Sequence, residues 1–208
     1  MKQKKCKVCK EPFEPQRGLQ SVCSFPCALK LAKEIERKAE NKKWQSEKKA
    51  MKDKLKTLSD WKKDLEVYVN KIVRLIDYEC NCISCPPTTP IQKGFAGHFH
   101  SVGSNDSLRF NLDNIHLQCY SCNGNKGGAQ VQYLAGMGRI YGDIYSDYVH
   151  YGIVRHYPAI HLSVPEIKDA IAVCKGIIKE LEGKMYVYDA PTRINLRNLY
   201  NEQIGIYK

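Results

Sequence analysis

The sequence predicts an α+β protein, and three observations lead to that prediction. Eight of its ten cysteines form two groups of four with the spacing of zinc ligands. Between and after these groups the chain carries segments with helical periodicity, and one stretch has the turn residues of a β-hairpin. With 208 residues, of which 43% are apolar, the chain can build one modest core and a small second module. We therefore expect a zinc-stabilised α+β module flanked by helices.

Residues 1–28 form the first predicted unit, a four-cysteine zinc knuckle. Cys6 and Cys9 make one pair, and Cys23 and Cys27 follow as a second pair. Two such pairs can present four thiolates to one tetrahedral zinc ion. A segment this short has little apolar material, so its folding should depend on the metal. The knuckle could contact DNA or a partner, or it could cap the next helix. We favour the cap, because the sequence shows no base-reading face.

Residues 29–58 form the second predicted unit, a long basic helix. This segment contains no Gly or Pro and is dense in Lys, Glu and Ala, which are good helix formers. Residues 1–58 hold 17 Lys and Arg against 7 Asp and Glu, and so carry nearly all of the net charge of +11. Such a segment attracts polyanions through counterion release. The helix could lie along DNA, pair with a second copy of the chain, or simply be solvated.

An amphipathic helix is predicted from Trp61 to Tyr78, at the start of a module that we assign to residues 59–135. Ser59 and Asp60 offer its N-cap. Apolar residues recur at helical spacing, so one face of this helix can be buried. These residues are Trp61, Leu65, Tyr68, Val69, Ile72, Val73, Leu75 and Ile76. The helix can therefore carry the core of the module.

The second four-cysteine group brackets a predicted β-hairpin. Its members are Cys82, Cys85, Cys119 and Cys122. The two pairs are separated by 33 residues, and one zinc ion bound by all four would pin the ends of the intervening loop. The strands are predicted at residues 92–100 and 114–117, joined by a segment rich in turn residues. The second cysteine pair then opens a short helix.

Residues 136–208 are predicted to be mainly helical. Ser163 and Glu166 have the spacing of a capping box, and apolar residues at helical spacing continue to Leu181. This helix should dock on the module. The tail from residue 185 onward contains no recognisable chemistry.

The cellular compartment is inferred from the thiols and from the start of the chain. The first residues include no apolar signal segment, and no apolar run approaches the length of a membrane span. In a reducing compartment, Cys-x2-Cys pairs are more often metal ligands than disulfides. We therefore expect a cytoplasmic protein with no membrane partner.

The stretch from Cys82 to Lys126 resembles a known family of nucleases. The matching residues are the four cysteines, Gly97-His98, Leu108-Arg109-Phe110, Asn114-Ile115-His116, Gln118, Asn123 and Lys126. The likeness is to the HNH, or ββα-metal, endonucleases, specifically to the NinG/Rap recombination proteins of lambdoid phages, and more distantly to phage endonuclease VII. It implies that the module is a ββα-metal fold. It also implies a phage or prophage protein that works in the cytoplasm of the bacterial host.

The resemblance assigns roles to three residues. His98 matches the general base of the family, and a neutral imidazole can take a proton from the water that attacks phosphorus. Asn123 matches a ligand of the catalytic metal, which would be Mg²⁺ or Mn²⁺; without the resemblance it would look like a helix cap. Asn114 matches the middle letter of the family motif and is expected to hold the loop that bears His98.

Two histidines are second-tier candidates, and two basic residues are the expected phosphate contacts. His100 and His116 could contact the catalytic metal or phosphate, although a histidine beside a zinc knuckle is as often a structural residue. Arg109 could hold the scissile phosphate with two parallel hydrogen bonds, and Lys126 could do so as a point charge.

Gly97 departs from the pattern of many HNH nucleases, in which an acidic residue or a histidine directly before the general base ligates the metal. The NinG/Rap pattern also has Gly-His at this point. Asn123 alone cannot hold a hard cation tightly. His100 or Asp106 is therefore expected to be recruited, with DNA phosphate oxygens completing the coordination shell. The four-thiolate zinc has no open coordination position, so it is expected to be structural.

The resulting hypothesis is a metal-dependent DNA endonuclease that hydrolyses phosphodiester bonds. In the resembled family the substrates are branched recombination intermediates such as Holliday junctions and D-loops. The alternative is a zinc-dependent DNA-binding module that has lost cleavage, which Gly97 favours. A nuclease without branch specificity is a variant of the first hypothesis. Cutting two strands symmetrically calls for two sites, which makes a homodimer plausible.

Overall fold

The computed structural model describes residues 3–87, 91, 94–157, 159–184 and 186–207. The chain divides into two compact units, Met1–Lys56 and Thr57–Lys208, and each is described by itself. Residues 59–135 and 136–208, which their sequence patterns separate, both lie in the second unit.

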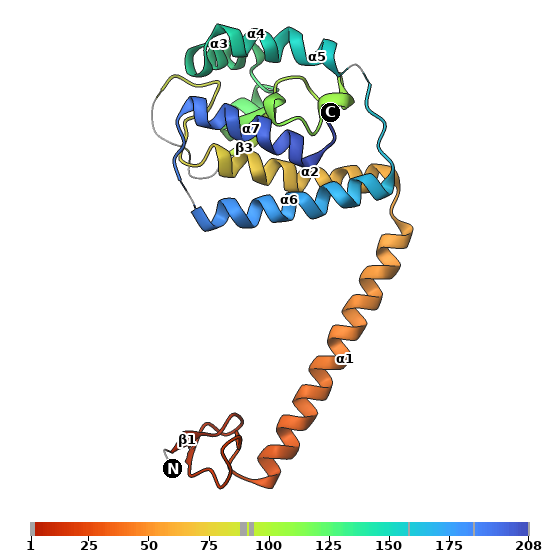
Figure 1. The fold of residues 1–208 in the computed structure, drawn as a ribbon, viewed down its shortest axis with the longest axis vertical. Helices are drawn as coiled ribbons and strands as arrows, with labels where there is room; N and C mark the ends of the chain where they lie inside the picture. Colours follow the sequence, from red (N-terminus) through yellow and green to blue (C-terminus); the bar gives the residue numbers. More distant parts are fainter. Residues whose placement is uncertain (1–2, 88–90, 92–93, 158, 185, 208) are drawn as a thin grey trace. The chain divides into compact units, whose positions relative to one another are not determined.

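The first unit consists of a small looped segment and one long helix (Figure 1). Strands β1 (Lys4–Lys5) and β2 (Pro12–Phe13) pair in antiparallel fashion, and helix α1 spans Phe25–Leu55. The helix begins earlier than the predicted residue 29 because Pro26 fits its first turn, where a missing N–H is no loss. No residue of α1 is buried, in keeping with its sparse apolar residues.

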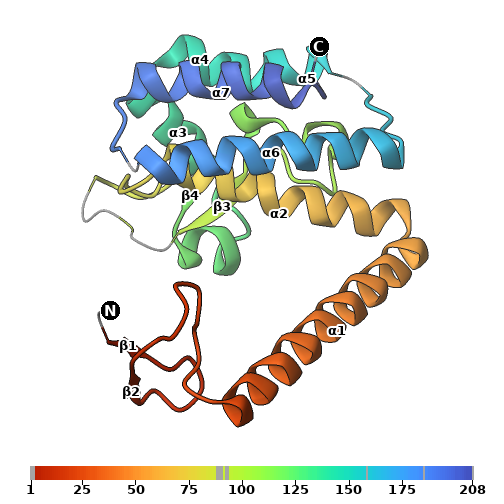
Figure 2. The same cartoon turned by 60° about the horizontal axis from the view of Figure 1, so that its bottom comes forward.

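Three helices of the second unit share the larger hydrophobic core: α2 (Leu58–Ile76), α6 (Val164–Lys184) and α7 (Ala190–Ile204). Figures 1 and 2 show α2 and α6 side by side. Buried apolar residues of both helices, among them Leu65 and Ile177, meet in this core, as the amphipathic patterns predict. Within the described residues, no helix combines the length and the apolar character that crossing a membrane requires.

The N-cap of α2 differs from the predicted one. Thr57, rather than Ser59 or Asp60, is the cap: its side chain accepts a hydrogen bond from the backbone N–H of Asp60. In return, the Asp60 carboxylate accepts one from the backbone N–H of Thr57 (3.0 Å). Asp60 is thus the third helical residue of a capping box. The box predicted before α6 is confirmed, because Ser163 donates its N–H to the carboxylate of Glu166 (2.7 Å).

The hairpin consists of β3 (Phe95–His98) and β4 (Ile115–Gln118), which pair in antiparallel register with Gly97 opposite His116. Both strands lie close to the predicted ones, but β3 is shorter than predicted because the chain bends after His98. Residues 92–93 of the predicted strand lie outside the described residues. Figure 2 shows the hairpin beside α2, against which both strands pack.

Short helical elements fill the connection between the strands and the segment that follows the hairpin. They are η1 (Asp106–Leu108), η2 (Leu112–Asn114), η3 (Ser121–Asn125), α3 (Gln130–Tyr141), α4 (Asp143–Asp147), η4 (Tyr148–Gly152) and α5 (Ile153–His156). A second core forms here, with Phe99, Leu108, Tyr133 and Met137 among its buried residues. The boundary drawn at residue 135 falls inside α3, whose residues on both sides of it belong to this core.

A buried ion pair joins α7 to the hairpin. Arg197 is fully buried, and its Nη2 atom lies 2.8 Å from both carboxylate oxygens of Asp77, the residue that follows α2. Asp77 also accepts a hydrogen bond from the backbone N–H of Leu117 in β4 (3.0 Å). Polar contacts therefore help to hold α7 in place, beside its core residues Tyr200 and Ile204. Apolar periodicity does not reveal such a helix, and no role was predicted beyond residue 185.

Candidate active site

Four cysteines form the base of the candidate site. The sulfur atoms of Cys82, Cys85, Cys119 and Cys122 all lie within 4.8 Å of one another. Cys85 Sγ is 3.5 Å from Cys122 Sγ and 3.8 Å from Cys119 Sγ. A tetrahedral zinc ion with Zn–S bonds of about 2.3 Å separates its sulfur ligands by roughly 3.8 Å. This cluster could therefore hold zinc with little rearrangement.

Backbone hydrogen bonds tie this cluster to the hairpin. The N–H of Ile83, which lies between the first two cysteines, donates to the carbonyl oxygen of Leu117 in β4 (2.9 Å). After the second pair, Asn123 donates its N–H to the carbonyl oxygen of Cys119 (3.0 Å). The position of Asn123 is thus set by the backbone of the cysteine cluster.

The other cysteine cluster lies in the first unit. The sulfur atoms of Cys6, Cys9, Cys23 and Cys27 also lie within 4.8 Å of one another, so these residues too could hold zinc. Cys27 stands in the first turn of α1, and a metal bound here would fix the start of that helix. Both four-cysteine groups that the spacing predicts are therefore assembled in the structure, and all ten cysteines are free thiols.

His98, the predicted general base, ends β3 and is half-buried. Its Nε2 atom lies 2.9 Å from the backbone carbonyl oxygen of Arg109. Because a carbonyl oxygen only accepts, Nε2 carries the proton and the neutral ring keeps its lone pair on Nδ1. In the part of the chain that the structure describes, Nδ1 has no hydrogen-bond partner. Burial lowers the pKa of His98, so the ring is neutral at neutral pH and can accept a proton.

Gly97, directly before His98, faces a space that two amide side chains fill. A Cβ atom added to Gly97 would lie 1.9 Å from Gln118 Oε1 and 3.0 Å from Asn123 Oδ1. The first distance is far inside van der Waals contact, so no larger residue fits at position 97 while Gln118 keeps its place. The predicted metal ligand Asn123 therefore lies beside Gly97. Gln118 was not predicted as a site residue. Its position in a strand, directly before Cys119, is the sequence feature that could have indicated it.

Asn114 is fully buried and holds the loop that follows β3. Its Oδ1 accepts a hydrogen bond from the N–H of His100 (2.8 Å), and its Nδ2 donates to the carbonyl oxygens of His100 (3.0 Å) and Leu108 (3.1 Å). Its own carbonyl oxygen accepts from the N–H of Phe99 (2.8 Å). These bonds fix the chain directly after His98, so Asn114 acts on the site through the backbone.

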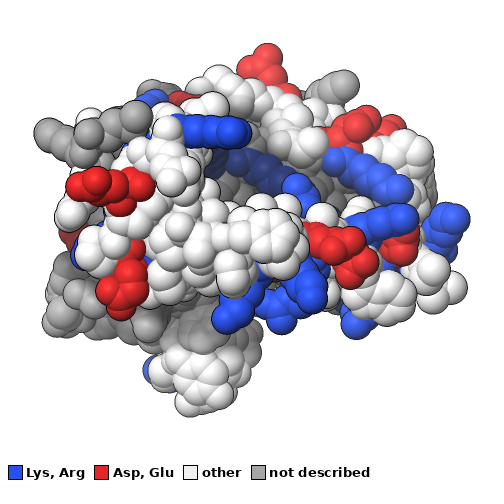
Figure 3. All heavy atoms as spheres, turned by 90° about the horizontal axis from the view of Figure 1, so that it is seen from below, with Lys and Arg blue, Asp and Glu red and all other residues white. Residues whose placement is uncertain are grey.

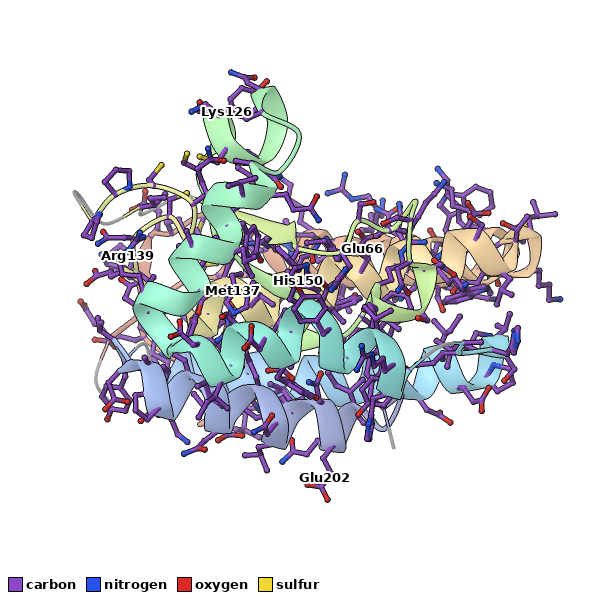
Figure 4. All side chains as sticks on the ribbon, turned by 90° about the horizontal axis from the view of Figure 1, so that it is seen from above. Glu66, Lys126, Met137, Arg139, His150 and Glu202 are labelled. Atoms are coloured by element: carbon purple, nitrogen blue, oxygen red, sulfur yellow. The ribbon has the colours of Figure 1, made fainter. Side chains whose placement is uncertain are left out.

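His100 faces a separate pocket rather than the cysteine cluster. Its Nε2 lies 2.9 Å from the carbonyl oxygen of Val149, and burial lowers its pKa. The pocket has a volume of about 390 Å³ and is also lined by His150, which Figure 4 labels, and by Arg155. None of the cluster cysteines lines it. Arg155 gives this pocket a cationic side chain.

His116 lies in the core. Its Nδ1 is 3.1 Å from the hydroxyl of Tyr133 and its Nε2 is 3.3 Å from the hydroxyl of Tyr145. Tyr133 in turn donates a hydrogen bond to the carbonyl oxygen of Gly97 (2.8 Å). Burial lowers the pKa of His116 well below its usual value. The structure therefore places His116 behind the site, where it supports Gly97 and is closed to metal or phosphate.

Arg109 and Asp106 are both paired with α2. The Nε and Nη2 atoms of Arg109 lie 3.0 and 2.6 Å from Oε2 of Glu66, which Figure 4 labels. Asp106 accepts a hydrogen bond from Lys62, which lowers the pKa of the carboxyl group, and it lies 3.5 Å from Nη1 of Arg109. Phosphate contact by Arg109, or metal contact by Asp106, would compete with these ion pairs.

Lys126 is exposed in the turn that follows the second cysteine pair. Figure 4 shows this turn projecting from the ribbon, with sulfur atoms at its base. Figure 3 shows both basic and acidic side chains on the face that it draws. Of the two predicted phosphate contacts, Lys126 is the one that is open to solvent.

Comparison with known proteins identifies the family. A family model described as "Bacteriophage Lambda NinG protein" matches residues 1–184. "Protein ninG" of Salmonella phage P22 is 37% identical to this chain over 149 residues, covering 62% of this chain and 71% of the relative. The proteins of the same name from Escherichia phages lambda and 933W are 34% and 35% identical, with the same coverage. No solved structure gives a significant match. The resemblance to the NinG/Rap proteins is confirmed, and the chain belongs to the bacteriophage NinG family.

Proposed function

We propose that this protein is a metal-dependent endonuclease that hydrolyses phosphodiester bonds in branched DNA. The observation that carries the proposal is the state of His98. Its protonated Nε2 is anchored on the carbonyl oxygen of Arg109, and its Nδ1 has no partner among the described residues. Burial keeps the ring neutral. A general base needs this combination of a fixed ring, an open lone pair and a pKa below the working pH.

In the proposed mechanism, His98 takes a proton from the attacking water at Nδ1. The ring then carries a positive charge, and its hydrogen bond to the carbonyl oxygen of Arg109 becomes charge-assisted. Asn123 Oδ1, beside Gly97, is a side-chain oxygen suited to a hard cation. When bound, Mg²⁺ or Mn²⁺ supplies positive charge that offsets the charge at phosphorus and on the leaving oxygen.

The cysteine cluster supports this chemistry without taking part in it. Four thiolates fill the coordination positions of a zinc ion, which leaves none for a substrate. The cluster instead holds Asn123, through the hydrogen bond from Asn123 N–H to the carbonyl oxygen of Cys119.

The proposed substrate class rests on membership of the NinG family and on its likeness to phage recombination proteins. Helix α1 supports a nucleic-acid substrate, because none of its residues is buried and it lies in the segment that carries most of the net positive charge. Cutting both strands of a junction requires two sites, so we expect two copies of the chain on one DNA. The protein would act in the cytoplasm of the phage's bacterial host.

A DNA-binding module without cleavage is the second candidate. Gly97 favours it, because the position before the general base offers no side chain to a metal. In that case the two cysteine clusters and the basic helix would serve binding alone.

The test is cleavage of a labelled four-way junction and of a linear duplex of the same sequence, with Mg²⁺ or Mn²⁺. His98→Ala should slow junction cleavage by about 10²–10⁴-fold, since that is the usual contribution of a general base. Its junction binding, measured in Ca²⁺, should match that of the wild type. His161→Ala, at an exposed histidine, is the matched control and should cleave normally.

Each other outcome points to one alternative. If the wild-type protein binds DNA but cuts neither substrate, the second candidate, a DNA-binding module without cleavage, is supported. Equal cutting of the duplex and the junction would show that the protein is a nuclease without branch specificity.

A further inference from the structure

We infer that Gln118 supplies an oxygen ligand to the catalytic divalent cation, in place of the side chain that Gly97 lacks. The inference rests on the proposed function, because it adds a ligand to the same site. Three observations carry it: an unpaired buried oxygen, a fixed amide orientation and the position of that oxygen beside Asn123.

The amide group of Gln118 is hydrogen-bonded on one side only. Gln118 is fully buried. Its Nε2 atom donates to Ser84 Oγ (2.6 Å) and to the carbonyl oxygen of Gly128 (2.7 Å). Its Oε1 atom is buried and has no hydrogen-bond partner among the residues described. Buried polar atoms in native proteins are almost always paired, so an unpaired one calls for a partner that the protein alone does not provide.

Gly128 fixes the orientation of this amide. A backbone carbonyl oxygen can only accept a hydrogen bond, so the NH₂ group of Gln118 must face it. The reversed amide would bring two acceptor oxygens to 2.7 Å from each other. The Oε1 atom is therefore directed to the other side, where Gly97 and Asn123 lie.

The Oε1 atom stands where a side chain of residue 97 would begin. Gly97 pairs with His116, so Gln118, two residues further along β4, shares its face of the hairpin. The Cβ position of Gly97 is 1.9 Å from Gln118 Oε1 and 3.0 Å from Asn123 Oδ1, which puts the two oxygens within about 5 Å of each other. Two oxygens bound to one Mg²⁺ ion at about 2.1 Å lie at most roughly 4.2 Å apart. A cation can bridge them with a small movement of the half-buried Asn123.

The chemistry of the pair predicts how the metal binds. Both oxygens belong to neutral amides, which suit Mg²⁺ and Mn²⁺ but hold them weakly without a charged ligand. The DNA phosphate would then complete the site, so the protein would bind metal tightly only together with its substrate. The competing explanation is that Oε1 merely packs against the Cα–H group of Gly97, a weak contact.

The test follows Mn²⁺ at Asn123 in ¹⁵N-labelled, zinc-loaded protein without DNA, by paramagnetic broadening of the Asn123 side-chain amide signal. Gln118→Met keeps the length of the side chain and removes the oxygen. The Mn²⁺ concentration that half-broadens the Asn123 signal should rise at least about fivefold, since one of two protein ligands is lost. Ser84→Ala removes a hydrogen bond on the nitrogen side of the same amide and is the matched control. It should stay within about twofold of the wild type.

A compensated variant covers the case in which Gln118→Met disturbs the fold. Gly97→Asp combined with Gln118→Ala moves the oxygen ligand to the other strand, into the space that Gln118 vacates. This variant should half-broaden Asn123 at a lower Mn²⁺ concentration than the wild type, because a carboxylate binds the cation more strongly than an amide. Zinc content and thermal unfolding of each variant show whether it is folded.

Two results would overturn the inference: no Mn²⁺ broadening of Asn123 in the wild type, or equal responses of Gln118→Met and Ser84→Ala. The readout is separate from cleavage. If the protein cuts no DNA but binds Mn²⁺ through Gln118, the inference stands and only the proposed function is refuted. If the protein cuts DNA but its Mn²⁺ response is the same in Gln118→Met as in the wild type, the proposed function stands and the inference about Gln118 is refuted.

Discussion

The two cysteine clusters have the same ligands and the same compactness but different surroundings. In the first unit Cys9 is exposed, and no described residue of this unit belongs to a hydrophobic core cluster. In the second unit Cys82 and Cys122 are buried and pack with Ala129. Their segment is also hydrogen-bonded to a hairpin that lies between two larger cores.

The difference shows that one ligand set can serve two purposes. A metal in the first unit would substitute for a core, so that folding and metal binding become one event. The second unit buries apolar side chains without any metal. A metal bound there would only have to fix the short segment that runs from Cys119 to Asn123, and would thus position the proposed site.

The largest expected difference between the two units is in their response to the loss of one cysteine ligand. Cys9→Ser should unfold the looped segment of the first unit, because structural zinc contributes on the order of 10 kcal/mol to such sites. Cys122→Ser should leave the helices of the second unit folded but displace Asn123 and slow cleavage by about 10²-fold or more. Hydrogen exchange read by mass spectrometry, with zinc measured per chain, should locate the two losses of protection separately. Global unfolding of the second unit by Cys122→Ser would erase the contrast.

The second unit should depend instead on its own buried contacts. Arg197→Met leaves the buried carboxylate of Asp77 without its main partner and should lower the free energy of unfolding by about 3–5 kcal/mol. Arg155→Met, at an exposed arginine, should change it by less than about 0.5 kcal/mol. Urea unfolding followed by circular dichroism gives both values. Zinc binding by the first unit should be unchanged in Arg197→Met; a loss there would show that the units are coupled.

The smallest expected effect is that of mild acid, which should lower the stability of the second unit through its histidines. All six histidines follow residue 97, so none lies in the first unit. The pKa of His116 is lowered well below 6.5, so the folded state keeps it neutral while the unfolded chain protonates it near that pH. Its contribution to stability is therefore complete above pH 6.5 and is lost as the pH falls. Between pH 7.5 and 6.0 this residue should cost about 0.8 kcal/mol.

His116→Gln, which cannot titrate, should show a smaller loss of stability over the same pH range. The measurement is urea unfolding at both pH values, with zinc content checked at each. Equal pH dependence in the two proteins would mean that another group is responsible.

The parts of the molecule that could be predicted are those set by local spacing. Two cysteine pairs around a turn define a metal cluster whatever surrounds them, and both clusters are assembled as predicted. The strands of the hairpin were placed to within a few residues, because they lie between turn signals and the cysteine pairs. The same stretch carries the family motif, so family membership was predictable too.

The parts that could not be predicted depend on contacts between distant residues. Asp77 and Arg197 are 120 positions apart, and neither looks like a core residue in the sequence. His98 and His116 are equally suited to catalysis as residue types. Only the packing of Tyr133 and Tyr145 around His116 removes it from the surface. The role proposed for Gln118 could not be predicted either, because it depends on the space left by the missing side chain of Gly97 across the hairpin.

The hydrogen bond from His98 to Arg109 has a consequence for the evolution of the protein. Its acceptor is a main-chain oxygen, and the hydrogen bond that places Asn123 also ends on one, that of Cys119. A point mutation exchanges a side chain and leaves the carbonyl where it was. The carbonyl anchor of His98 therefore survives replacement of the Arg109 side chain, whereas the anchor of Asn123 also depends on the cluster thiol of Cys119. Only changes in the path of the chain, such as an insertion, a deletion or a backbone ester, would disturb the anchor of His98.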